Sequence, residues 1–115
     1  MKKSSPRNLT EKEQNAVSAF SRQVKKELGS QLVSMKLFGS KVRGDFRQGS
    51  DIDIYIVIKS NSLKVREKIA EIDAVVWDEY EVSLSPVVYS SYEEERNLSM
   101  HSFFFEAVQR EGISL

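Results

Sequence analysis

The sequence contains no cysteine, and this absence excludes disulfide bonds, thiolate metal sites and cysteine nucleophiles. It has a single histidine, His101, so a metal site built from several histidines is excluded as well. The longest mainly apolar stretch covers residues 52–58 and is too short to span a bilayer, and no apolar segment follows the basic N-terminus. These absences are typical of a soluble, cytoplasmic protein.

The chain also lacks a net charge, because 17 basic and 17 acidic side chains cancel. No overall electrostatic field attracts nucleic acid or an anionic membrane, so neither is expected as a partner. A length of 115 residues is that of one domain. We expect a polar, disordered N-terminus over residues 1–9 and a single domain over residues 10–115.

Hydrophobic periodicity predicts an alternation of helices and strands. Thr10 and Glu13 form a capping-box pattern that begins a first helix, which Gly29 is placed to end. Strands are expected over 32–38, 51–58 and 81–88, and further helices over 62–78 and, in two pieces broken near 98–102, over 92–110. This order predicts an α/β (α+β) fold in which helices pack on a small mixed β-sheet.

Three consecutive phenylalanines lie in the last expected helix. We expect Phe103 and Phe104 to pack inward, and Phe105 is the candidate for an exposed position at an interface.

Two polar segments in the middle of the chain carry the candidate chemistry. Gly39-Ser40 follows the first expected strand directly, and Ser50-Asp51-Ile52-Asp53 opens the second. Side chains alternate along a strand, so Asp51 and Asp53 project from one face while Ile52 faces the core. Two neighbouring carboxylates repel each other and favour a bound cation. Oxygen ligands on a rigid strand suit Mg²⁺, which keeps several waters and shares phosphate oxygens with a substrate.

The segment between these two strands is suited to a phosphate group. Gly39 allows close approach of the backbone, and Ser40 offers a backbone N–H and a hydroxyl to an anionic oxygen. Lys41 and Arg43 add positive charge beside them. Alternatively, these glycines are ordinary turn residues and the aspartates face water at a strand end. The combination of Gly-Ser with Asp-x-Asp favours metal-assisted phosphoryl or nucleotidyl transfer over that alternative.

The motif formed by Gly39-Ser40, Gly44 and Ser50-Asp51-Ile52-Asp53 resembles a known signature. This signature, GS-x(3)-G-x(n)-SD-x-D, belongs to the minimal nucleotidyltransferase group of the polymerase-β-like superfamily. The resemblance implies that Asp51 and Asp53 ligate Mg²⁺ while a nucleoside triphosphate, with ATP as the expected donor, is bound by Gly39, Ser40, Lys41, Arg43 and Ser50. It further implies that NMP is transferred to an acceptor hydroxyl and that pyrophosphate is released.

The family pattern usually adds a third carboxylate on a later strand, and here the sequence departs from it. On the third expected strand Glu81, Ser83 and Ser85 share one face, and the central position is a serine. Glu81 is the best candidate for the third catalytic carboxylate, with Glu79 and Asp78 behind it. The departure leaves open an alternative function, a catalytically weak module that binds a nucleotide and acts by protein–protein association.

A domain of this size has no obvious second unit to hold an acceptor. The resemblance implies that a partner supplies it, because proteins of this group are commonly paired with a small all-helical protein of the HEPN type. In toxin–antitoxin pairs the transferase adds AMP to the helical toxin. Assembly into a homo-oligomer is a further alternative. An RNA-binding α/β domain is a weaker interpretation, because the chain has no net positive charge and no aromatic strand platform.

Overall fold

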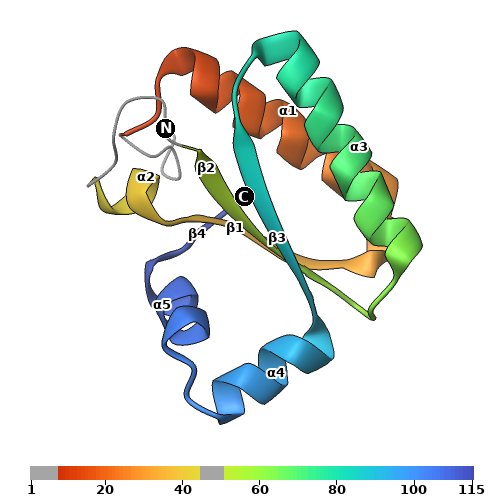
Figure 1. Ribbon diagram of the computed structural model, residues 1–115, viewed down its shortest axis with the longest axis vertical. Coiled ribbons are helices and arrows are strands. Elements are labelled where there is room, and N and C mark those ends of the chain that lie inside the picture. Colours follow the sequence, from red (N-terminus) through yellow and green to blue (C-terminus); the bar gives the residue numbers. More distant parts are fainter. Residues whose placement is uncertain (1–7, 45–50) are drawn as a thin grey trace.

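The computed structural model describes residues 8–44 and 51–115 as a four-stranded sheet with helices on both faces (Figure 1). The elements are α1 (Glu11–Leu28), a 3₁₀ turn (Gly29–Gln31), β1 (Leu32–Phe38), α2 (Ser40–Arg43), β2 (Ile52–Ile58), α3 (Leu63–Tyr80), β3 (Leu84–Ser90), α4 (Ser91–Ser99), α5 (Phe103–Glu111) and β4 (Ile113–Ser114). The predicted α+β architecture is confirmed.

The sheet has the strand order β3-β2-β1-β4 and is mixed, as predicted. β1 runs antiparallel to β2 and to β4, whereas β2 and β3 are parallel and are joined by the crossover helix α3. Pro86 lies in β3 at the edge of the sheet, where its missing N–H breaks no ladder. The short strand β4 was not predicted.

Local side-chain signals begin the long helices where the sequence indicates. Thr10 caps α1 through the predicted capping box, in which its hydroxyl accepts from the Glu13 N–H and the Glu13 carboxylate accepts from the Thr10 N–H. Ser62 caps α3 by accepting from the Val65 N–H. Gly29 follows α1 with φ 54°, a backbone conformation that suits glycine.

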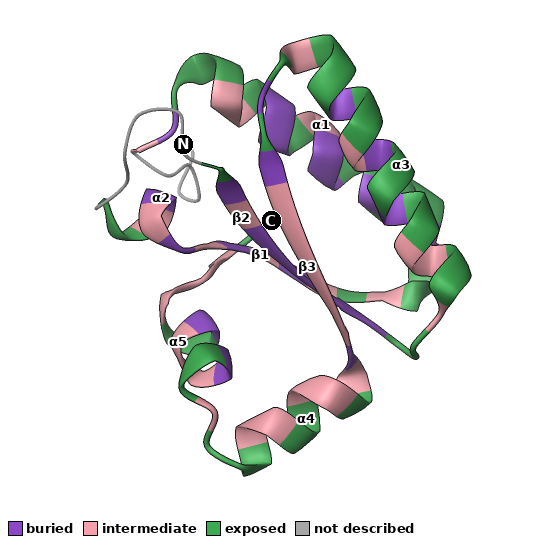
Figure 2. Cartoon of the chain, viewed as in Figure 1, coloured by how far each residue is buried: buried purple, intermediate pink, exposed green. Residues whose placement is uncertain are grey.

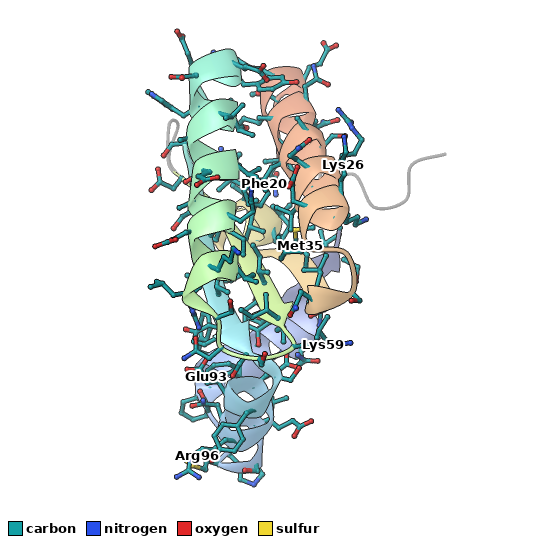
Figure 3. The ribbon with its side chains drawn as sticks, turned by 90° about the vertical axis from the view of Figure 1, so that its right-hand side faces the viewer. Phe20, Lys26, Met35, Lys59, Glu93 and Arg96 are labelled. Carbon is teal, nitrogen blue, oxygen red and sulfur yellow. The ribbon has the colours of Figure 1, made fainter. Side chains whose placement is uncertain are left out.

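The two faces of the sheet carry separate hydrophobic clusters, visible as buried segments on both sides in Figure 2. Under α1 and α3 the first cluster is mainly aliphatic, with Phe20 fully buried between the helices and the sheet (Figure 3). The second cluster lies under α5 and centres on Tyr55, Val57, Phe105 and Val108. Strand β2 is therefore buried on both faces over most of its length.

Two expectations about burial are wrong. Phe105 is only 5% exposed, whereas Phe103 is 89% exposed. The reason is that α5 begins at Phe103, so that Phe105, two residues later in the helix, faces the sheet. At the N-terminus, Leu9 belongs to the core and Asn8 donates a hydrogen bond to the Lys41 carbonyl, so these two residues are not frayed. Residues 1–7 lie outside the described part of the chain.

Within residues 8–44 and 51–115, the structure contains no helix that is both long enough and apolar enough to cross a membrane.

Candidate active site

The neighbouring ends of β1 and β2 bring the Gly-Ser segment against the second aspartate. Phe38 and Asp53 are directly paired across the two antiparallel strands, so Gly39 follows at the position beside Asp53. Gly39 has φ 88°, and a Cβ added there would collide with the Asp53 carboxylate oxygen Oδ2 and lie 3.1 Å from its Cγ. The backbone turn and the carboxylate therefore share a space that only glycine leaves open.

The electrostatics of Asp53 show that it sits in the field of its neighbours. Burial is the main factor that raises the pKa of the Asp53 carboxyl, and the negative charge of Asp51 raises it further. The Arg43 guanidinium opposes both effects by lowering this pKa. Asp53 thus lies in the field both of Asp51, two residues before it in the chain, and of Arg43 at the end of α2.

This donor set fits a divalent cation. Two carboxylates that destabilise each other gain from a shared positive charge, and both offer only oxygen ligands. Mg²⁺ is typically held by one or two carboxylates together with water and substrate phosphates. Among residues 8–44 and 51–115 there is no group of three or more Asp, Glu or His side chains that could hold a metal by themselves. A cation here would need substrate oxygens to complete its shell.

The short helix α2 presents the other predicted binding residues. Its first residue, Ser40, is half-buried, and Arg43 at its end is exposed. The N–H groups of Val42 and Arg43 both donate to the Gly39 carbonyl, at 3.0 and 3.1 Å, which closes the turn directly after β1. Ser50, the remaining predicted nucleotide-binding residue, lies outside the described residues.

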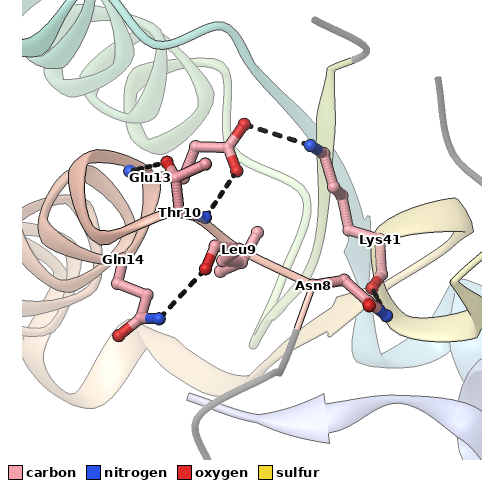
Figure 4. A network of polar contacts seen from close by, with 6 residues as sticks. All are labelled: Asn8, Leu9, Thr10, Glu13, Gln14 and Lys41. Atoms are coloured by element: carbon pink, nitrogen blue, oxygen red, sulfur yellow. Dashed lines mark hydrogen bonds and ion pairs between the residues drawn. The ribbon is translucent and has the colours of Figure 1, made fainter. Parts of the chain in front are cut away.

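Lys41 is found in an environment that the sequence did not indicate. Its side chain is only 3% exposed, and its ammonium group lies 3.0 Å from Oε2 of Glu13 at the start of α1 (Figure 4). The contribution of Lys41 to nucleotide binding stays a prediction, and the ion pair gives this residue a structural role as well. Glu13 and Asn8 are the contacts that sequence reasoning missed, because their partner lies 28 and 33 residues away.

The prediction that Glu81 lies on the third strand is wrong. α3 continues to Tyr80, and Glu81 ends it in a left-handed conformation with φ 55°, three residues before β3 begins. Its exposed side chain lines a cavity of about 350 Å³ together with Trp77 and Lys12. The residue paired with Asp53 on β3 is Ser85. A catalytic role for Glu81 stays a prediction that this placement does not favour.

The chain is similar in sequence to known proteins. Residues 17–107 match the family model of the nucleotidyltransferase domain. A "putative protein adenylyltransferase" of Methanocaldococcus jannaschii is 27% identical over 100 residues, which is 86% of this chain and 94% of that protein. The crystal structure of a "putative nucleotidyltransferase" from Sulfolobus solfataricus is 22% identical, with a TM-score of 0.43 over 78% of this chain and 84% of that one. Because the family model covers most of the sequence, this chain belongs to the nucleotidyltransferase domain family and is a nucleotidyltransferase, an enzyme that transfers a nucleoside monophosphate.

Proposed function

We propose that this chain transfers AMP from ATP to a hydroxyl group on a protein, with Mg²⁺ bound at Asp51 and Asp53. The observation that carries the proposal is the contact between the Gly39 backbone and the Asp53 carboxylate. It joins a turn suited to phosphate oxygens with a carboxylate pair suited to Mg²⁺, so one triphosphate can reach both.

The reaction exchanges one P–O bond for another. The acceptor oxygen forms a bond to the α-phosphorus, the bond from this phosphorus to the bridging oxygen breaks, and pyrophosphate leaves with both electrons of that bond. The hydroxyl proton passes to solvent. Bound Mg²⁺ would neutralise charge on the phosphates and polarise the α-phosphoryl group.

The residues of the chain supply positioning and charge. The turn at Gly39 and Ser40 holds the triphosphate beside Asp53, and Arg43, whose charge already acts on Asp53, compensates for the negative charge of the phosphates. Ser85 lies beside Asp53 on the neighbouring strand and lines the side of β2 opposite to Gly39. Since attacking and leaving oxygens lie roughly in line, the acceptor approaches from the β3 side.

Two considerations support a protein as the acceptor. The relative from Methanocaldococcus jannaschii, which this chain matches over nearly its whole length, carries the name of a protein adenylyltransferase. The signature in the sequence is that of a group whose members commonly pair with a small helical HEPN-type protein, which makes such a protein the first acceptor to test. Co-purification from the native host that recovers no helical protein labelled with AMP would contradict this choice.

The direct test is calorimetric titration of ATP and the other nucleoside triphosphates in the presence of Mg²⁺. The double variant Asp51→Asn/Asp53→Asn is expected to lose more than about 100-fold in affinity, because even residues that only support metal ligands contribute 10- to 100-fold. Asp73→Asn is a matched control, since Asp73 lies in the field of Asp51 but belongs to α3. Equal losses in the control and the double variant would show that bulk charge, and not a metal site, governs binding.

A second candidate function is favoured by the position of Glu81. Without a carboxylate beside Asp53 on β3, the domain would bind a nucleotide and act through protein association. Release of pyrophosphate from ATP in the presence of the acceptor distinguishes the two functions. ATP binding without turnover would favour the binding module.

A further inference from the structure

The buried ion pair between Lys41 and Glu13 joins two parts of the molecule that are distant in sequence. Its Nζ–Oε2 distance is 3.0 Å, and the two side chains are 3% and 17% exposed. Another ion pair between α1 and a second helix, Lys68–Glu27, is looser at 3.8 Å, and its side chains are 45% and 33% exposed. An exposed pair of that kind contributes little, whereas a buried pair constrains the position of both partners.

The two oxygens of Glu13 have different partners (Figure 4). Oε1 accepts from the Thr10 N–H in the capping box of α1, and Oε2 binds the Lys41 ammonium group. The capping box fixes the carboxylate on the first turn of α1, so Oε2 is presented to Lys41 from a rigid position.

A second contact ties the same residue of α2 to the N-terminal segment. Asn8 donates from Nδ2 to the Lys41 carbonyl at 2.8 Å, and the adjoining Leu9 is buried in the core. Lys41 is thereby held at its backbone and at the end of its side chain. The helix that it belongs to has only one turn and follows Gly39 directly, so its own hydrogen bonds cannot fix its position relative to α1.

We propose that Lys41 is a positioning residue, which acts through its ion pair with Glu13 to hold the Gly39-Ser40 turn against Asp53. The proposal rests on the function proposed above, because it assigns to this turn the binding of the triphosphate. Lys41 thus supports nucleotide binding indirectly, by fixing the position of the turn, and its charge is compensated by Glu13.

The opposite interpretation makes Lys41 a phosphate ligand that Glu13 holds back. The two interpretations predict opposite effects for Glu13→Gln, a substitution that keeps a capping oxygen for Thr10 and removes the charge facing Lys41. A positioning role predicts about tenfold weaker binding of ATP with Mg²⁺, the scale of losses when a supporting contact is removed. A ligand role predicts tighter binding, because the released ammonium group can reach the phosphates.

The experiment combines ATP titration with hydrogen exchange of the nucleotide-free protein, both measured well below the melting temperature. The N–H groups of Val42, Arg43 and Gly44 are hydrogen-bonded in the turn and report its stability. Glu13→Gln is expected to raise their exchange rates and to weaken ATP binding. Glu27→Gln is the matched control, because it removes the α1 end of the exposed ion pair and is expected to change neither.

A double variant, Glu13→Gln/Lys41→Met, covers the case in which removing the Glu13 charge beside buried Lys41 unfolds the protein. It is expected to fold, to exchange faster in the turn and to bind ATP about tenfold more weakly than wild type. Tighter binding by Glu13→Gln, or wild-type exchange and affinity in the double variant, would overturn the proposal. If the wild type fails to bind ATP, only the proposed function is contradicted. The positioning role is then decided by hydrogen exchange in the variants: faster exchange in the turn would support it, and unchanged exchange would refute it.

Discussion

The two faces of the sheet are covered by different side chains. One face carries the larger hydrophobic cluster, and the other lies next to the candidate active site. The face under α1 and α3 is covered by a large aliphatic cluster that extends over the whole length of β2, with Ile52, Ile54, Ile56 and Ile58 fully buried. The opposite face has a smaller cluster in which the rings of Phe38, Tyr89, Phe104 and Phe105 surround Tyr55. That cluster is centred on Tyr55 and leaves Asp53, at the start of β2, only half-buried.

This asymmetry explains how one strand can be both a core element and a site. Alternation places Asp53 on the same face as Tyr55 and Val57, so the aromatic cluster packs immediately beside the carboxylate. Phe38 belongs to this cluster and is also the residue that pairs with Asp53 and precedes Gly39. The aliphatic face stabilises the packing of the helices on the sheet, and the aromatic face supplies the side chains next to Asp53.

The largest expected effect comes from the aliphatic face. Phe20→Ala removes a ring that is fully buried between α1 and the sheet, and about 3–5 kcal/mol of stability is expected to be lost because a cavity remains. Chemical denaturation measures the loss. In whatever fraction stays folded, ATP affinity should be unchanged because Phe20 lies on the face opposite to Asp53.

Phe103→Ala is the matched control for this truncation, since its ring is 89% exposed. It is expected to change stability by less than about 0.5 kcal/mol. A loss from Phe103→Ala as large as that from Phe20→Ala would show that the exposed ring is packed against something in solution.

A smaller effect is expected from the hydrogen bond inside the aromatic face. The Tyr55 hydroxyl donates to Oε2 of Glu94 at 2.9 Å, and burial, followed by this bond, raises the pKa of Tyr55. Tyr55→Phe is expected to reduce stability by about 1.5 kcal/mol, the low end for a bond to a charged group. The low end applies because Gln109 also donates to the same oxygen, at 3.2 Å.

Thermal and chemical denaturation of Tyr55→Phe can be compared with Tyr89→Phe in the same cluster. The described residues offer no hydrogen-bond partner to the Tyr89 hydroxyl, so its removal is expected to have less effect. If both variants lost the same stability, the loss would come from removing a hydroxyl group in this cluster and not from the hydrogen bond to Glu94.

Sequence reasoning succeeded where the signal is local. The capping box at Thr10, the boundaries of β1 and the place of Gly39-Ser40 directly after β1 all follow from residues close together in the chain. The mixed sheet followed from the order of elements, because a crossover helix makes its two strands parallel.

The failures have physical causes that the sequence does not display. Glu81 ends α3 in a left-handed conformation that favours glycine or asparagine, so nothing marked the helix end and the strand was placed too early. For Phe103 and Phe105, an uncertainty of one residue in the start of α5 reverses which ring is buried. The strand β4 depends on pairing with β1, including the bond from the Leu115 N–H to the Met35 carbonyl, and has too few residues to show a pattern.

The smallest expected effect concerns the site itself and has the opposite sign. In the folded protein burial and the charge of Asp51 raise the pKa of Asp53 above its unfolded value, so folding with this carboxylate ionised costs free energy. Asp53→Asn removes that cost, and without Mg²⁺ a small rise in melting temperature is expected at neutral pH. The difference in stability between variant and wild type should shrink as pH falls from the raised pKa of Asp53 toward the ordinary carboxyl pKa. Over this range Asp53 of the folded wild type becomes protonated and no longer carries the unfavourable charge.

Melting curves over this pH range, with and without Mg²⁺, measure the difference. Mg²⁺ together with ATP should stabilise wild type and not the variant, since binding to the native state alone raises stability by mass action. If the variant were less stable than wild type at neutral pH without Mg²⁺, the ionised Asp53 carboxylate would be stabilised by favourable contacts. It would then not cost folding free energy in the absence of a cation. The predicted combination, a more stable fold that no longer responds to Mg²⁺ and ATP, is expected when a residue is kept for function at the expense of stability.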